Sequence, residues 1–449
     1  MSTRGARAPP AAPPFGPRDV LELTSVLLAL TAVLAFINSR FLRYPPAIGL
    51  LIIALVSALL LKGAGLLGWL DLMPVIHFLE EVDFGDTLLN GMLGLLLFAA
   101  ALHLNFNELR KQGMAVTLLA TVATVICAVL VAGMVMLLGP IAGVTIPVLW
   151  ALAFGILIAP TDPIAVSALL KRAGVPGGLQ KAIAGESLFN DGVGVVLFLV
   201  VLTALRSGDA PSGGEIVRLL AVEVGGGLAF GFGLGWLGVQ MLRQIDEYQT
   251  EILLTLALAF GGFTLARHLH VSGVLGMVVL GLMIGRQGGD DVISARTKHR
   301  LDDFWELIDE FLNAALFVLI GVEILVIDLQ PSALLLGMLL IPVVLAARWL
   351  SVVGALAPIR RKLGWPAGSV ALLTWAGVRG GISIALALSL PPDPLRTTLL
   401  AAAYVLVCFS ILVQGLSVGA VSKRVLAVAK APAAAGGADT PDAARVAGP

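Results

Sequence analysis

The chain is poor in charge. Lys, Arg, Asp and Glu together make up 13 % of its 449 residues, whereas apolar residues make up 58 % and the mean hydropathy is +0.98. In soluble domains about a quarter of the residues are charged. Apolar stretches of about 18 or more residues recur along the chain, separated by short charged connectors. The sequence therefore predicts a protein that crosses a membrane many times.

Metal ligands and surplus positive charge are also missing. The five histidines are scattered, with neither an HExxH pair nor a Cys/His cluster, so no structural metal site is predicted. Cys127 and Cys408 lie in apolar runs, which indicates packing rather than a disulfide. Zero net charge excludes a basic patch for nucleic acid. The glycines between residues 225 and 235 lie inside an apolar span and do not follow the pattern of a phosphate-binding loop, so they do not indicate a nucleotide site. We therefore expect no cofactor.

The two ends of the chain differ in composition from the rest. Residues 1–17 are rich in Pro and Ala, and no short apolar region with a cleavage site follows them, so they do not resemble a signal peptide. Residues 427–449 are rich in Ala, Gly and Pro. Both ends are predicted to be disordered tails on one transmembrane domain, residues 18–426.

Hydropathy predicts an all-α membrane protein of about thirteen spans. The stretch 74–85 is too acidic to cross a bilayer and is predicted to lie at the surface. Lys and Arg collect in alternate connectors, which places the N-terminus outside and the C-terminus in the cytoplasm of a cell inner membrane. The predicted spans are 19–38, 46–63, 87–106, 114–138, 145–170, 179–205, 215–242, 249–267, 272–286, 303–327, 332–357, 366–390 and 396–422.

Two of these spans contain residues that interrupt a helix. The fifth holds two prolines around Thr161 and Asp162, and each proline removes a backbone donor and clashes with the preceding turn. The twelfth holds three glycines around Arg379. Paired broken helices predict an inverted repeat with the transport site at their crossing. We expect repeats at about 19–205 and 249–422, joined by a linker helix at about 215–242.

The sixth span carries two carboxylates in an apolar helix. Charged groups at this depth are costly unless they have partners, and they mark ion or proton pathways. Asp191 shares a helix face with Ser187, and Glu186 shares one with Asn190. We expect Asp191 to bind a hard cation or a proton, which compete for its oxygens. The candidate residues of the cation and proton site are Asp191, Asp162, Thr161, Ser187 and Asn190. Glu186 is expected to form a structural ion pair with Arg379, because a buried arginine without a partner is costly.

Four stretches together resemble the monovalent cation:proton antiporter-1 family, the NhaP/NHE-type sodium/proton antiporters. They are APTDPIAVSALLK (159–171), GESLFNDGVGVVLF (185–198), FWELIDEFLNAALFVLIGVEI (304–324) and WAGVRGGISIALALSLP (375–391). The resemblance implies an NhaA/NhaP-like thirteen-helix fold, a homodimer, and an elevator-like movement of a core bundle.

The resemblance also implies the roles of individual residues. Asp191 would bind the transported Na⁺ or H⁺, with Thr161, Asp162 and Ser187 near it. Asn190 beside Asp191 is the mark of the electroneutral branch of the family, which implies exchange of one Na⁺ for one H⁺ in pH and cation homeostasis.

One position departs from the family pattern. Many relatives carry a glutamate in the third span where this chain has Ala99. A family carboxylate is then missing, which leaves the choice among Na⁺, Li⁺ and K⁺ open. K⁺/H⁺ exchange is therefore an alternative within the same fold.

The tenth span begins with three acids, Glu306, Asp309 and Glu310. They resemble an acidic lining that concentrates cations at a cytoplasmic entry funnel. A solvated helix end explains the same pattern equally well.

Two other function classes compete with exchange. An intramembrane hydrolase would need paired-aspartate motifs or a GxSxG serine with a histidine partner, and neither is evident. A cation channel would need a continuous pore without proton coupling. The buried carboxylates in paired broken spans favour a transporter over both, so no enzymatic activity is expected.

Overall fold

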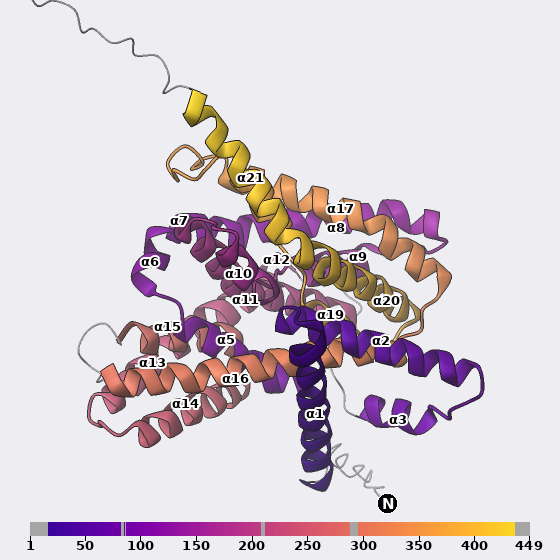
Figure 1. The fold of residues 1–449 in the computed structure, drawn as a ribbon, viewed down its shortest axis with the longest axis horizontal. Helices are drawn as coiled ribbons and strands as arrows, with labels where there is room; N and C mark the ends of the chain where they lie inside the picture. The colour runs from indigo at the N-terminus through magenta and orange to yellow at the C-terminus, as the bar shows by residue number, and fades with distance from the viewer. Residues whose placement is uncertain (1–16, 82–84, 86, 208–211, 288–294, 436–449) are drawn as a thin grey trace, which may run out of the picture.

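The computed structural model of the protein describes residues 17–81, 85, 87–207, 212–287 and 295–435, and every regular element in these ranges is helical (Figure 1). The first half contains α1 (Pro17–Ile37), η1 (Asn38–Leu42), α2 (Pro46–Leu66), α3 (Met73–Glu81), η2 (Thr87–Met92), α5 (Leu93–Leu102), α6 (Phe106–Lys111), α7 (Gly113–Leu118), η3 (Leu119–Ala123), α8 (Thr124–Leu138), η4 (Gly139–Ala142), α9 (Val148–Ile158), α10 (Ile164–Arg172) and α11 (Gly177–Ser207). The second half contains α12 (Gly213–Leu220), η5 (Ala221–Gly226), α13 (Gly227–Leu242), α14 (Tyr248–His268), α15 (Gly273–Gln287), α16 (Ala295–Val322), η6 (Glu323–Leu325), α17 (Pro331–Leu356), α18 (Ser369–Trp375), α19 (Gly381–Leu388), α20 (Pro394–Phe409), η7 (Ser410–Gly415) and α21 (Leu416–Ala435).

The predicted all-α, multi-span architecture is confirmed. Each predicted span coincides with a helix, with consecutive helical segments, or with a pair of short helices. Eight of the described helices are long and apolar enough to cross a bilayer. Shorter apolar helices include α5, α9 and α15. The fifth and twelfth spans are each divided into two half-helices, and α16 begins with a charged half, so none of these three is a simple apolar span.

The ends of the chain differ in part from the prediction. The predicted C-terminal tail was to begin at residue 427, but α21 continues as a helix to Ala435. Alanine has a high helix propensity, and the segment extends a helix that is already formed. Residues 1–16 and 436–449 lie outside the described residues. The acidic stretch 74–85 contains the short helix α3 and no described span.

The helix α11 lies between two groups of helices. It contacts both α9 and α15. α9 packs against α8, and α17 packs against both α8 and α20, whereas α15 packs against α5 and α13. Figure 1 shows α8 and α17 toward the top and α13, α14 and α16 toward the bottom, with α11 between them. The carboxylate-bearing helix is thus placed at the centre of the molecule.

Candidate functional site

The two interrupted spans cross each other at their breaks. Residues 159–163 separate α9 from α10, and residues 376–380 separate α18 from α19. The backbone N–H of Asp162 donates to the carbonyl oxygen of Val378 at 2.6 Å. A side chain at Gly380 would place its Cβ 2.5 Å from Oδ2 of Asp162, so only glycine allows this approach. Proline and glycine at the two breaks therefore bring two unwound segments into direct contact.

Charged side chains complement the ends of the half-helices. Oδ1 of Asp162 accepts from the backbone N–H of Ile164 at 2.8 Å, at the positive N-terminal end of α10. Nη1 of Arg379 donates to the carbonyl oxygens of Ala159 at 2.5 Å and Pro160 at 3.0 Å, just past the negative C-terminal end of α9. The freed backbone groups at the crossing thus obtain partners inside the protein, as membrane depth requires.

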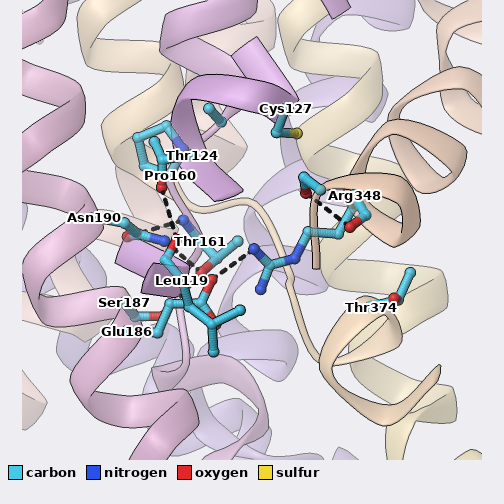
Figure 2. Close-up of polar contacts among 12 residues, drawn as sticks. Leu119, Thr124, Cys127, Pro160, Thr161, Glu186, Ser187, Asn190, Arg348 and Thr374 are labelled. Carbon is cyan, nitrogen blue, oxygen red and sulfur yellow. Dashed lines mark hydrogen bonds and ion pairs between the residues drawn. The ribbon is translucent and has the colours of Figure 1, made fainter. Parts of the chain in front are cut away.

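The ion pair predicted between Glu186 and Arg379 is wrong. Glu186 pairs instead with Arg348 of α17, with 2.6 Å between Oε1 and Nη1 and side-chain exposures of 1 % and 3 % (Figure 2). The guanidinium group of Arg379 is occupied by the carbonyl oxygens at the end of α9. Backbone carbonyls thus bind one buried arginine, and the carboxylate of α11 pairs with the other.

A network of polar side chains ties Thr161 to α11. The Thr161 hydroxyl lies 3.0 Å from the Ser187 hydroxyl and accepts from Nδ2 of Asn190 at 3.0 Å. The backbone N–H of Thr161 donates to Oδ1 of Asn190 at 3.4 Å. Figure 2 shows Thr161 between Asn190 and Ser187, while Glu186 points away from them toward Arg348. The unwound segment is therefore held on α11 through one residue.

A cavity of about 180 Å³ lies beside the crossing. Thr161, Asp162 and Asp191 all line it. Asp191 is only 9 % exposed, and its carboxyl group is close enough to that of Asp162 for the two to repel each other when charged. Helix α11 approaches the break closely at Gly194, which has no side chain; a Cβ at this position would collide with Pro160. Two carboxyl groups from different elements therefore line one small cavity.

The four stretches that carry the family resemblance meet at this cavity. The first contributes Thr161 and Asp162, the second contributes Asp191, and the fourth contributes Gly380. The third contributes Asn313 from the apolar half of α16. Segments that are far apart in the sequence thus form one site.

Sequence reasoning missed Asn313 and Ser383, which both line the cavity. A signal for Asn313 was present, because it is a polar residue in an apolar stretch, four residues after Asp309. Asp309 is half-buried, whereas Glu306 and Glu310 are exposed. The three acids of α16 therefore lie at different depths.

The α5 side of the cavity is apolar. The residues that α5 contributes to its lining are Leu93, Leu96, Leu97 and Ala100. Ala99 is fully buried and is not among the lining residues. Among the residues that the structure describes, the carboxylates of this cavity thus come from the broken fifth span and from α11.

Comparison with known proteins identifies the family. A family profile described as "Sodium/hydrogen exchanger, transmembrane" matches residues 26–424, which include every residue of the site. The chain belongs to this family. The resemblance seen in the four sequence stretches is thereby confirmed.

Individual members of the family match along nearly the whole chain. The Na⁺/H⁺ antiporter NhaP of Pseudomonas aeruginosa is 43 % identical over 413 residues, which cover 91 % of this chain and 97 % of that protein. The Na⁺/H⁺ antiporter NhaH of Halobacillus dabanensis is 32 % identical over 424 residues and is covered to 99 %.

A solved structure shares the fold. The sodium proton antiporter MjNhaP1 from Methanocaldococcus jannaschii superposes with a TM-score of 0.71 at 18 % sequence identity. The superposition covers 91 % of this chain and 99 % of that one. The helical architecture predicted here is therefore that of an experimentally determined antiporter.

Proposed function

We propose that this chain exchanges Na⁺ for H⁺ across the membrane, one for one, at the cavity that contains Asp191. The observation that carries the proposal is the composition of the cavity wall. Two carboxyl groups line it, and none of its described lining residues is Lys, Arg or His. Buried carboxylates without a fixed positive partner require a proton or a mobile cation. The printed names of the relatives, Na⁺/H⁺ antiporters, agree with these two occupants.

Competition for Asp191 accounts for the exchange. When Asp191 loses its proton, its carboxylate can bind Na⁺ together with the hydroxyl of Thr161 and the carboxylate of Asp162. Ser187, which is buried and does not line the cavity, contacts the Thr161 hydroxyl from α11. A proton arriving from the other side displaces the cation, provided that the site opens to one side at a time. One titrating ligand then moves one charge in each direction. We infer electroneutral exchange and an elevator-like alternation on this basis.

The remaining polar residues of the site serve as its scaffold. Asn190 is fully buried, binds Thr161 and does not line the cavity, so it positions a ligand rather than binding the ion. The Glu186–Arg348 pair ties α11 to α17. Arg379 holds the end of α9 at the crossing. These contacts keep the two broken helices in one geometry while the occupant of Asp191 changes.

The surroundings of the transporter follow from the same proposal. We place the protein in the cell inner membrane as a homodimer, with its N-terminus outside and its C-terminus in the cytoplasm. The exposed acids Glu306 and Glu310, with Asp309 deeper in the protein, would then form a cytoplasmic funnel that attracts cations toward the cavity. The repeats at about 19–205 and 249–422 and the linker helix at about 215–242 are part of this proposal.

Everted membrane vesicles test the proposed exchange directly. An acid interior is established in vesicles that contain the protein, and the interior pH is followed with a dye while Na⁺, Li⁺ or K⁺ is added outside. We expect Na⁺ to dissipate the pH gradient with saturable kinetics, and to do so equally when the membrane potential is clamped at zero. Vesicles without the protein provide the control. A response that matches this control for all three cations would contradict the proposal, and a rate that follows the potential would contradict electroneutrality.

The Thr161 hydroxyl offers a second test in the same vesicles. Thr161→Val removes an acceptor for Asn190 and a partner for Ser187 while keeping the side-chain shape. Leaving buried polar groups without partners costs about 1–3 kcal/mol, and 1.4 kcal/mol corresponds to tenfold in an equilibrium constant. We expect the half-saturating Na⁺ concentration to rise about tenfold. Thr161→Ser keeps the hydroxyl and should stay close to the wild type; equal affinities in both variants would exclude a role for the hydroxyl.

A further inference from the structure

Asn313 lines the cavity but takes no part in the proposed exchange as described above. It belongs to α16, which contributes to the cavity beside α5, α11 and the two broken spans. Its side chain is only 5 % exposed. Leu316, one turn after Asn313, packs closely against Gly381 and holds this part of α16 next to the second break. The packing depends on glycine, since a Cβ at position 381 would collide with Leu316.

The orientation of the Asn313 amide is determined by its neighbours. Nδ2 of Asn313 donates to the backbone carbonyl oxygen of Asp309 at 2.8 Å and to Oδ1 of Asp309 at 3.0 Å. A backbone carbonyl can only accept a hydrogen bond, so the NH₂ group must face Asp309 and the amide oxygen must face away from it. Asp309 therefore positions Oδ1 of Asn313.

This amide oxygen has no hydrogen-bond partner. Oδ1 of Asn313 is buried and accepts from no protein donor, although buried polar atoms almost always have a partner. Several other buried side-chain atoms among the described residues accept or donate no hydrogen bond, but none of their residues lines the cavity of Asp162 and Asp191; they belong to Thr31, Asn38, Glu251, Arg348 and Trp365. Asn313 is thus the described residue that combines an unpartnered oxygen with a place at the cavity.

We propose that Oδ1 of Asn313 is a ligand of the transported cation, contributed by α16, and that Asp309 is the residue that positions it. The proposal rests on the exchange of Na⁺ for H⁺ at Asp191. Hard cations are bound by oxygen ligands, and a neutral amide oxygen coordinates a cation without adding charge. An amide does not take up a proton in the physiological range, so this ligand favours Na⁺ over H⁺ at the shared site. Asn313 therefore sets the affinity for the cation but not the affinity for the proton.

Removing the amide oxygen separates these two affinities. Asn313→Leu has a similar shape without an oxygen, and Asn313→Ala is a smaller second variant in case the first does not fold. We expect the half-saturating Na⁺ concentration in vesicles to rise about tenfold in both, which corresponds to the loss of one ligand. The pH dependence of the rate at saturating Na⁺ should remain that of the wild type. An unchanged half-saturating concentration in either folded variant would overturn the proposal.

Asp309 provides a matched pair for the positioning step. Asp309→Asn and Asp309→Leu both remove the negative charge, but only the first keeps a side-chain oxygen that can accept from Asn313. We expect the half-saturating Na⁺ concentration of Asp309→Leu to be several-fold above that of Asp309→Asn. Equal values in the two variants would overturn positioning by the Asp309 side chain and leave its backbone carbonyl, which both variants keep, as the group that orients Asn313.

A binding measurement distinguishes failure of this proposal from failure of the exchange function. Na⁺ should raise the unfolding temperature of the purified wild-type protein, because a ligand that binds the folded state stabilises it. Asn313→Leu should require about tenfold more Na⁺ for the same rise. A wild type that neither transports nor is stabilised by Na⁺ would refute the proposed function. A wild type that responds, together with an Asn313→Leu variant that responds identically, would refute only the role of Asn313.

Discussion

Asp191→Asn is expected to abolish Na⁺-dependent dissipation of a pH gradient, down to the level of vesicles without the protein. The amide has nearly the same shape as the carboxylic acid but neither binds a proton nor carries the negative charge that attracts Na⁺. The side chain is almost fully buried, so solvent cannot take over its role. The other residues of α11 that line the cavity are uncharged, so none of them could replace it. The measurement is the interior-pH assay in everted vesicles, with the amount of protein matched by immunoblot.

Two controls make the Asp191 result specific. Asp191→Glu retains a titrating carboxylate and should retain measurable exchange at a reduced rate. The purified Asp191→Asn protein should unfold at or above the wild-type temperature, since it removes a buried charge that lies close to another of the same sign. Exchange by Asp191→Asn at the wild-type rate would exclude Asp191 as the ion ligand.

Arg348→Met is expected to destabilise the fold strongly. Arg348 is almost completely buried, and its removal leaves the carboxylate of Glu186 buried without its positive partner. Breaking a buried ion pair from one side typically costs about 3–5 kcal/mol. We expect a lower unfolding temperature and a lower yield of folded protein in detergent, with a greater effect than that of an apolar substitution on the outer face of the same helix, such as Leu350→Met.

The second member of the pair should rescue the first. In Arg348→Met, the additional substitution Glu186→Gln removes the unpartnered charge and should restore part of the lost stability. The same Glu186→Gln substitution should not rescue Arg379→Met, because Arg379 binds the carbonyl oxygens of Ala159 and Pro160. Rescue of Arg379→Met but not of Arg348→Met would contradict the pairing in the structure.

Local sequence determined the spans, the breaks and the central carboxylate. Long apolar runs can only be buried as helices in a bilayer, so composition and hydropathy were sufficient for the all-α fold. The two prolines around Thr161 and Asp162, and the glycines around Arg379, act on their own backbone, so both interruptions were predictable. Asp191 was identifiable because a carboxylate in an apolar helix is costly wherever that helix packs.

Contacts between distant segments were decided only by the tertiary structure. Sequence spacing indicated that Glu186 needed a partner, but two buried arginines were available, and the choice depended on which one reached the carbonyl oxygens of α9. The role of Asn313 likewise depends on how α16 packs against the second break and on the orientation that Asp309 imposes on its amide. Hydropathy and helical periodicity describe one segment at a time, whereas these choices are made by side chains that meet across the crossing of the broken helices.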